Sequence, residues 1–409
     1  MGKNFNDPEV IRQGIEQSKQ AFICLDCLDT SDRLLKLEDI IRMPKRTWLC
    51  PECKGCAHNV NQHCIKSPSG DKLFGRDPEY IPITHLCYVG KRTPNDEKIC
   101  MSELCCPLCK NPIHKTVGKT VIISIVGTRD SGKSHYIGVL LHELMENFSN
   151  IMHWKVEVED DTRKMYDNNF SSLYNAQQTL ALTMQNMTGF YAPYIFYVTP
   201  PGKSTFTLVF FDTAGEDFNS DNLIENSAKH IFQADGVIFI IDPLKMNDLN
   251  NQIEEDVIAS SSSSTYERLQ NNSLLTMVST TIRRHLQIPD SEQISIPMAI
   301  TLSKFDTIEK LFPSYNTIVI DSNHRRIGAF SEQDCESVNK EVFKFLNRQD
   351  STEIKSFLMQ LQINYSDYHL FGASALGLRN HPINGRIKRP KPHRVEDPLL
   401  WILKNKNVI

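Results

Sequence analysis

A glycine-containing segment at residues 127–134, Gly-Thr-Arg-Asp-Ser-Gly-Lys-Ser, has residue types suited to holding a polyphosphate. Glycines let backbone N–H groups approach a polyanion, a lysine adds positive charge, and a serine hydroxyl is an oxygen ligand that suits Mg²⁺. We expect Lys133 to reach the β- and γ-phosphates and Ser134 to ligate Mg²⁺. The predicted contacts of this phosphate loop are Gly127, Asp130, Ser131, Gly132, Lys133, Ser134 and His135.

A second motif follows an apolar run. Residues 208–211 are Leu-Val-Phe-Phe, and Asp212-Thr-Ala-Gly215 comes directly after them. This Asp-x-x-Gly pattern ends a buried strand in nucleotide-dependent switches. We expect Asp212 to hold Mg²⁺ through water and the Gly215 N–H to contact the γ-phosphate. The two motifs together predict a triphosphate site.

A third motif selects the base. Ser303-Lys-Phe-Asp306 follows the apolar run 298–302. The Asp306 carboxylate can accept hydrogen bonds from guanine N1–H and N2–H, a pair of donors that adenine lacks. Lys304 is expected to lie over the base and ribose. Ser303 stands where Asn or Thr is usual, so a weaker brace to the phosphate loop is expected.

Two further elements are short. Ser374-Ala375-Leu376 has the form of a loop whose backbone contacts guanine O6. A threonine ahead of residue 212 should coordinate Mg²⁺ through its hydroxyl. We assign Thr188, with Thr183 as the alternative, and an ordinary loop threonine is the competing interpretation of either.

The capacity for hydrolysis depends on the residue that follows Gly215. Ras-like enzymes orient the attacking water with a glutamine at this position, whereas this chain has Glu216, a possible base that also lies near a polyanion. Arg129 in the phosphate loop is either a source of transition-state stabilisation or structural. Arg163 is a second candidate, for which a solvated surface position is favoured. The candidate catalytic residues are Lys133, Glu216, Arg129 and Thr188.

Buried strands and amphipathic helices must position these loops. Apolar runs typical of buried strands occur at residues 121–126, 194–198, 206–211, 237–241, 298–302 and 369–373. Behind the phosphate loop, Ile137, Leu140, Leu141, Leu144 and Phe148 form one apolar stripe at helical spacing. The pattern predicts that residues 119–409 form an α/β P-loop GTPase domain, with a six-stranded, mostly parallel sheet and helices on both faces.

Three connections are longer than such a domain needs, namely 134–212, 215–303 and 306–374. We expect additional helices within them and a flexible loop at the serine run 260–264. The basic run 386–394 is interpreted as a solvated loop, with a phosphate or RNA contact as the alternative. A closing helix is predicted from Asp397, with Pro398 in its first turn.

Cysteines dominate the first 118 residues, because 11 of the chain's 12 cysteines lie at positions 24–109. Thiolate pairs separated by two residues suit tetrahedral Zn²⁺, so residues 1–118 are predicted to form a zinc-ribbon module that binds about two ions. The predicted ligands are Cys24, Cys27, Cys50 and Cys53 in one set, and Cys87, Cys100, Cys106 and Cys109 in the other. Alternative ligands are Cys56, Cys64, Cys105, His58 and His63.

Charge and hydropathy indicate which partners and which cellular location to expect. The chain carries a net charge of −4, and residues 1–118 hold 17 Lys and Arg against 15 Asp and Glu, which argues against nucleic acid as a partner. The N-terminus lacks a signal-peptide pattern, and the apolar runs are too short to span a bilayer. We therefore expect a cytoplasmic protein without membrane contact.

The cysteine pairs, the phosphate loop, Asp212-Thr-Ala-Gly-Glu216 and the C-terminal Arg394-Val-Glu-Asp-Pro-Leu-Leu-Trp401 together resemble one bacterial group. This group is the TRAFAC-clade double-GTPase family with N-terminal zinc ribbons. The resemblance implies a GTPase fold, phosphate roles for Lys133 and Ser134, a Mg²⁺ role for Asp212 and base recognition by Asp306. It also implies a place in multi-protein conflict or antiphage systems, beside a second GTPase or an effector.

The expected function is a GTP-controlled switch that interacts with other proteins and hydrolyses GTP, slowly or upon activation by a partner. Two alternatives stay open. One is a nucleotide-gated scaffold with little or no hydrolysis, and the other is a zinc-ribbon nucleic-acid binder under nucleotide control.

Overall fold

The computed structural model describes residues 114–180, 193–212, 230–246, 249, 271–377 and 385–409, and the backbone of five short strands ahead of them. The chain divides into two compact units, Met1–Val117 and Gly118–Ile409. The first unit spans the cysteine-rich region. The second contains every predicted nucleotide motif.

The first unit contains two small antiparallel sheets, each of three strands, with the orders β2-β1-β6 and β4-β3-β5. Their strands are β1 (Ala21–Ile23), β2 (Leu34–Leu35), β3 (Ile41–Pro44), β4 (Ile81–Pro82), β5 (Ser102–Cys105) and β6 (His114–Thr116). The eight predicted zinc ligands lie outside the residues that the structure describes. The zinc module therefore stays a prediction.

The second unit is built on a seven-stranded sheet with the order β13-β12-β11-β7-β10-β9-β8. Its strands are β7 (Thr120–Gly127), β8 (Lys155–Val158), β9 (Tyr194–Thr199), β10 (Phe206–Asp212), β11 (Gly236–Ile241), β12 (Met298–Leu302) and β13 (Tyr368–Gly372). The five strands from β13 to β10 are parallel, whereas β9 and β8 pair antiparallel at one edge. The α/β fold and all six predicted strands are confirmed, and the sheet has one strand more than expected.

The additional strand is β8, which the apolar pattern missed. Its sequence, Lys-Val-Glu-Val, alternates between exposed and half-buried side chains. It lies at the edge of the sheet, where it pairs with β9. Short, charged strands are typical of sheet edges because charge discourages pairing with another chain, but four such residues carry too little apolar signal to predict a strand.

The helix behind the phosphate loop is α2 (Lys133–His142), which continues into a π-helical turn, η2 (Glu143–Asn147), and α3 (Phe148–Ile151). All five residues of the predicted apolar stripe are at most 2% exposed, and burial of such side chains contributes about 1.5–3 kcal/mol each. The π-helical turn begins at the buried Glu143, which accepts a hydrogen bond from Arg325 at 2.9 Å.

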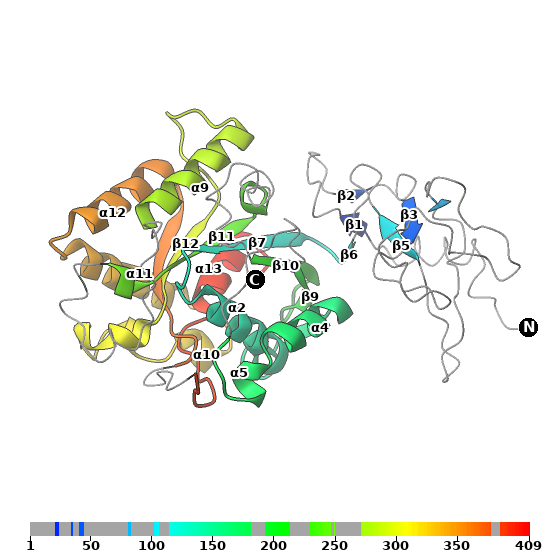
Figure 1. The fold of residues 1–409 in the computed structure, drawn as a ribbon, viewed down its shortest axis with the longest axis horizontal. Helices are drawn as coiled ribbons and strands as arrows, with labels where there is room; N and C mark the ends of the chain where they lie inside the picture. Colours follow the sequence, from blue (N-terminus) through cyan, green and yellow to red (C-terminus); the bar gives the residue numbers. More distant parts are fainter. Residues whose placement is uncertain are drawn as a thin grey trace, which may run out of the picture. The chain divides into compact units, whose positions relative to one another are not determined.

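The long connections supply additional helices, as predicted. These are α4 (Asp160–Asn169), α5 (Ser172–Asn175), α9 (Asn271–Leu286), α10 (Asn323–Ile327), α11 (Glu332–Asn347) and α12 (Thr352–Asn364), with 3₁₀ turns η4 (Pro243–Lys245), η5 (Phe305–Thr307), η6 (Glu309–Leu311) and η7 (Thr317–Val319). Ser331 and Ser351 cap α11 and α12 by accepting hydrogen bonds from backbone N–H groups. Figure 1 shows α9, α11 and α12 gathered away from α2, α4 and α5, with strands of the sheet between the two groups.

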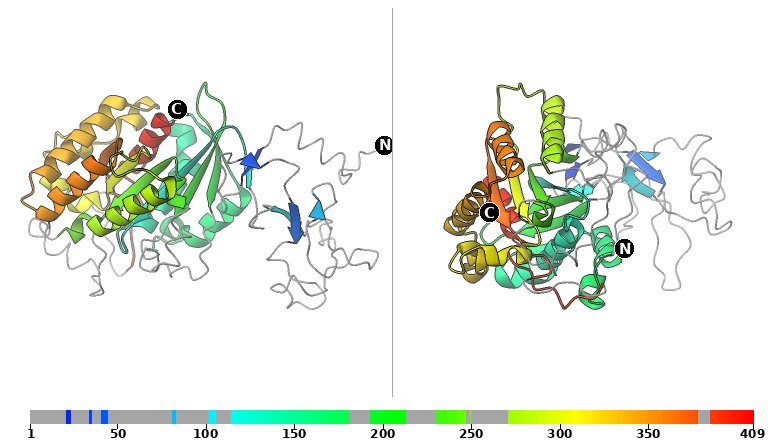
Figure 2. Two further views of the ribbon diagram at one scale, coloured as in Figure 1. Left: turned by 90° about the horizontal axis from the view of Figure 1, so that it is seen from above. Right: turned by 60° about the vertical axis from the view of Figure 1, so that its left-hand side comes forward.

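The closing helix is α13 (Asp397–Asn405), with proline in its first turn as predicted. It packs on β11 and β12, and Figure 2 shows it beside the central strands. Residues 399, 400, 402 and 403 of this helix are fully buried, so the C-terminal segment is part of the core. Within the described ranges, no helix combines the length and hydropathy needed to cross a membrane.

Candidate nucleotide site

The predicted motifs meet at one edge of the sheet. Five parallel strands end there, at Gly127, Asp212, Ile241, Leu302 and Gly372. β7 lies between β10 and β11. The chain fills the sheet on the β10 side of β7 first and then crosses to β11 on the other side, so the strand order reverses at β7. Ligands of open α/β sheets bind beyond the carboxyl ends of the strands at such a switch point.

The phosphate loop turns sharply before α2. Asp130 and Gly132 have positive φ values of 56° and 82°, and glycine adopts this left-handed conformation without the strain that a Cβ adds. The Tyr136 N–H donates to the Gly132 carbonyl at 2.9 Å, which closes the first helical turn. Lys133 and Ser134 are therefore the first two residues of the helix, at the positive end of its dipole.

Lys133 and Asp212 form an ion pair across the site. The two side chains keep 12% and 23% of their exposed area, so the pair is largely shielded from solvent. The contact brings the first and second motifs together, although 79 residues separate them in the sequence.

Ser303 joins the base motif to the phosphate loop. Its hydroxyl donates to the Ser131 carbonyl at 2.6 Å and lies 3.0 Å from the Ile241 carbonyl. One hydroxyl has one hydrogen to donate, so it serves these two acceptors in turn. The sequence predicted a weaker brace between this motif and the phosphate loop. The structure contains the brace, and the Ser303 hydroxyl that forms it is buried between the two carbonyl groups.

Removal of this brace should loosen the site. Ser303→Ala leaves the buried Ser131 carbonyl without its donor, so we expect the free energy of unfolding to fall by about 1–2 kcal/mol. Urea unfolding measures the change. Ser303→Thr keeps the hydroxyl and serves as the matched control; equal stability of the alanine and threonine variants would contradict the assignment.

Lys304 lies across the outside of the phosphate loop. It adopts a left-handed conformation with φ 48°. Its ammonium group donates to the buried Asp242 carboxylate at 2.6 Å and to the Asp130 carbonyl at 3.2 Å. Lys245 donates to the Arg129 carbonyl. Two lysines thus hold adjacent carbonyl groups of the loop.

Asp242 and Lys245 contact residues of the candidate site, and the sequence analysis missed both. Asp242 is 2% exposed and also accepts a hydrogen bond from the Leu244 N–H at 3.0 Å, which caps η4. The available signal was its position, because Asp-Pro-Leu-Lys directly follows a fully buried strand. A charged residue at the carboxyl end of a parallel strand is a candidate for a site.

Asp306 and Ser374, both predicted to recognise the base, contact each other. The Ser374 hydroxyl donates to Asp306 Oδ1 at 2.6 Å, and the Phe305 N–H donates to the Ala373 carbonyl at 3.1 Å. Ala375, next to Ser374, is half-buried. The third motif and the last motif are therefore neighbours, as a shared base site requires.

His135 links the phosphate loop to the first insertion. Its Nε2 accepts a hydrogen bond from the Leu180 N–H at 3.3 Å, which requires the neutral ring. Burial, and secondarily the charge of Lys304, lowers the pKa of His135 from 6.5 to about 4. The ring is therefore a neutral acceptor at neutral pH.

This low pKa makes folding sensitive to acid. Between the unfolded pKa of 6.5 and the folded pKa of about 4, the unfolded state binds more protons, so stability falls as the pH drops, by at most about 1.4 kcal/mol per pH unit. Partial exposure of the ring reduces the effect. His135→Gln keeps an acceptor for Leu180 but does not titrate. We expect the variant to lose less stability than the wild type between about pH 7 and about pH 5 in urea unfolding; equal losses would contradict this role.

Several predicted residues lie outside the described ranges. These are Thr183, Thr188, Gly215 and Glu216. Arg129 is exposed at the turn of the phosphate loop. Arg163 lies on α4 and pairs with Glu146 at 3.5 Å, with both side chains about half exposed (46% and 51%), which agrees with the favoured surface position.

The prediction of a solvated loop at 386–394 was wrong in part. Arg386, Lys388, Arg389 and Lys391 are exposed, whereas Ile387, His393 and Arg394 are buried. Arg394 is only 1% exposed, and its guanidinium pairs with Asp334 at 2.8 Å and with Asp397 at 2.6 Å. These two carboxylates offset the cost of burying the positive charge.

Comparison with known proteins identifies a family model that matches this sequence. Residues 121–358, more than half of the chain, match the family model described as Double-GTPase 2. A curated relative from Mycolicibacterium smegmatis is 26% identical over 325 residues, which cover 73% of this chain and 78% of the relative. That protein is described as "Putative ESX-1 scaffolding and assembly protein SaeC".

Two solved structures are also similar. One is the Arl6 small GTPase of Trypanosoma brucei with a bound nucleotide analogue, at 12% identity, a TM-score of 0.28, and coverage of 70% of this chain and 97% of that one. The other is the GTP-bound Ski7 GTPase-like domain of S. cerevisiae, at 15% identity, a TM-score of 0.32, and coverage of 71% and 51%. These scores are low, so the fold assignment rests on the sheet itself.

Proposed function

The chain belongs to the Double-GTPase 2 family, and from this premise we propose that it binds GTP and GDP at the carboxyl edge of its seven-stranded sheet. The observation that carries the proposal is the meeting of four motifs, distant in sequence, at this edge. Lys133 contacts Asp212, Ser303 contacts Ser131, and Ser374 contacts Asp306.

The arrangement favours guanine over adenine. Ser374 uses one oxygen of Asp306, and a carboxylate has further lone pairs with which to accept from guanine N1–H and N2–H. An adenine ring offers no such pair of donors, so the carboxylate would gain neither of these two hydrogen bonds from the base. Lys304 is held by Asp242 and the Asp130 carbonyl, and we propose that its methylenes cover the base.

Magnesium suits the residues at the phosphate end. The Ser134 hydroxyl and the Asp212 carboxylate are hard oxygen donors, the type that Mg²⁺ prefers. When bound, the ion neutralises charge on the β- and γ-phosphates. Ser134 and Asp212 would hold it, with Thr188 as the proposed third ligand. Lys133 would then donate to phosphate oxygens from the start of α2.

We propose that hydrolysis is slow unless a partner assists it. Glu216 stands where a water-positioning glutamine is usual, and its negative charge opposes the approach of the phosphates. Arg129, on the exposed turn of the phosphate loop, is the residue that we propose to offset that charge. The observation that favours a nucleotide-gated scaffold without hydrolysis is the description of the relative as a scaffolding and assembly protein.

Single-turnover phosphate release separates the two functions. Protein loaded with GTP and Mg²⁺ should release phosphate, and Lys133→Ala protein should not. Stable retention of intact GTP by the wild type would exclude hydrolysis by the chain alone and favour the scaffold.

Partners are proposed to be other proteins of one assembly. The relative's description concerns assembly, and the family resemblance implies a bacterial conflict or antiphage system, so both support a role among several proteins. Loops around Thr188 and Gly215 that change with the nucleotide would supply the surface that such a partner reads.

A further inference from the structure

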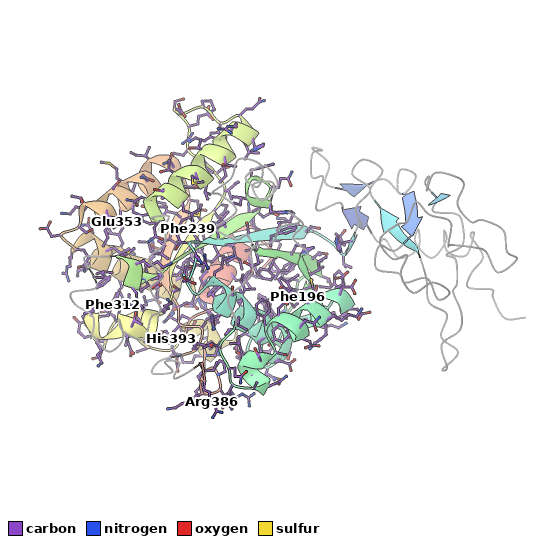
Figure 3. All side chains as sticks on the ribbon, in the orientation of Figure 1. Phe196, Phe239, Phe312, Glu353, Arg386 and His393 are labelled. Atoms are coloured by element: carbon purple, nitrogen blue, oxygen red, sulfur yellow. The ribbon has the colours of Figure 1, made fainter. Side chains whose placement is uncertain are left out.

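After the last predicted motif, residues 374–376, the chain contacts the candidate nucleotide site once more. Residues 385–397, which we call the strap, run from the exposed Gly385 to the first residue of α13. Figure 3 labels Arg386 at the outer end of this segment and His393 further inside the domain. The strap was not among the residues predicted to shape the site.

The strap pairs with the base loop, residues 374–377, through the backbone. Ser374 and His393 exchange two hydrogen bonds, of 3.0 and 2.9 Å, and the Lys391 N–H donates to the Leu376 carbonyl at 3.1 Å. Gly377 has φ 95°, and a Cβ there would lie 2.1 Å from the Lys391 carbonyl oxygen. The loop that should contact guanine is thus held as part of a small ladder.

The His393 side chain extends this contact to the base motif. Its Nε2 donates to the Ile318 carbonyl at 2.7 Å, since a carbonyl oxygen only accepts. Its ring stacks on Phe305 with a centroid separation of 5.7 Å. Phe305 is the neighbour of Asp306, so His393 buttresses both parts of the predicted base site.

Arg394 anchors the strap in the core. Besides its pairs with Asp334 and Asp397, it donates to the Thr317 and Ile320 carbonyls at 2.6 and 3.1 Å. Removal of one partner from a buried pair of this kind leaves an uncompensated charge in the core, which strongly destabilises the fold. Arg394 therefore fixes the position of His393.

A metal ion is not the better account of this cluster. His324, Asp334 and Asp397 present ligand atoms within 4.8 Å of one another. However, His324 Nδ1 accepts a hydrogen bond from the Ser331 N–H at 2.8 Å. The ring proton is then on Nε2, which has no lone pair to offer a metal, and the arginine already compensates the two carboxylates.

The other end of the strap holds the segment that precedes residues 181–192. The Thr179 N–H donates to the Gly385 carbonyl, and the Ile387 N–H donates to the Gln177 carbonyl, both at 2.9 Å. Leu180, one residue further, donates to His135 in the phosphate-loop helix. The strap thus contacts the base loop at one end and the approach to Thr183 and Thr188 at the other.

We propose that the strap is a positioning element of the guanine site, in which His393, fixed by Arg394, holds the base loop against Asp306 and sets how long guanine nucleotide stays bound. This inference rests on the proposed function, because it concerns the same site. The base loop is the element predicted to contact guanine O6, so its displacement would break that contact, and each strap contact opposes such displacement.

Release of fluorescent N-methylanthraniloyl-GDP, chased with excess GDP, tests the proposal. His393→Ala removes the side-chain hydrogen bond and the stacking but keeps the backbone pairs, and we expect release to be about fivefold to tenfold faster. His393→Gln, which can still donate to Ile318, should recover part of the difference. Lys391→Ala is the matched control, because Lys391 contacts the base loop through its backbone N–H and its side chain is exposed.

Hydrogen exchange separates positioning from general destabilisation. In the His393→Ala protein, faster exchange confined to residues 374–377 and 177–180 supports the proposal, and uniformly faster exchange that includes α9 overturns it. Equal release rates for the wild type and His393→Ala overturn the strap proposal alone. A wild-type protein that binds no labelled GDP overturns the proposed function and the strap proposal together.

Discussion

Replacement of Lys133 with alanine is expected to weaken GTP and GDP binding at least about a hundredfold and to abolish phosphate release. Lys133 is the first residue of α2, and its ammonium group lies against Asp212. Without it, the site keeps the negative charge of Asp212 and loses the cation that faces the phosphates, so two effects act in the same direction. Titration of fluorescent GDP measures the loss.

Lys164→Ala is the matched control for this substitution. Lys164 also pairs with an aspartate, Asp161, at 2.9 Å, but both side chains are more than two-thirds exposed (71% and 77%) on α4. Exposed pairs of this type contribute little, so nucleotide affinity should not change. Near-normal affinity of the Lys133→Ala protein, or equal losses in both variants, would show that the phosphates bind elsewhere.

Asp306→Asn is expected to reduce guanine affinity about a hundredfold and to raise affinity for xanthosine nucleotides. An asparagine presents one acceptor and one donor group where the aspartate presents two acceptors, and xanthine carries a carbonyl where guanine carries its amino group. The Ser374 hydroxyl can still donate to the remaining side-chain oxygen, so the loop should keep its structure. Competition assays with labelled GDP and labelled XDP measure how far the base preference shifts from guanine to xanthine.

Asp350→Asn controls for the removal of one negative charge. Asp350 is fully exposed, lies between α11 and α12, and pairs with Lys355 at 3.0 Å. We expect no change of base preference in this variant. A drop in affinity for GDP and ADP alike in the Asp306→Asn protein would mean that Asp306 supports the fold of the loop and does not read the base.

The central sheet was predictable because its strands are continuous apolar runs. Residues 237–241 and 298–302 are buried along their whole length in β11 and β12, and such runs leave little ambiguity about parallel strands covered on both faces. The phosphate loop was predictable because its residues are contiguous. By contrast, β8 is exposed on an edge, where selection favours charge over apolar content.

The supports of the site were not predictable in the same way. Asp242 holds Lys304 from a different strand end, and a single aspartate after a strand carries no motif. We predicted that Arg394 is solvated because the run 386–394 is basic. Its burial depends on Asp334, which is 60 residues away in the sequence. Local composition cannot show such a partner. The pairing of the strap with the base loop was not predictable, because it is made by backbone groups, which leave no residue-type signal.

Equilibrium competition for the wild-type protein tests the central claim most directly. With labelled GDP bound in the presence of Mg²⁺, unlabelled GDP and GTP should displace the label at least about a hundredfold more effectively than ADP and ATP. Displacement by ATP at the same concentrations as GTP, or failure of labelled GDP to bind, would contradict a guanine site formed by Lys133, Lys304, Asp306 and Ser374.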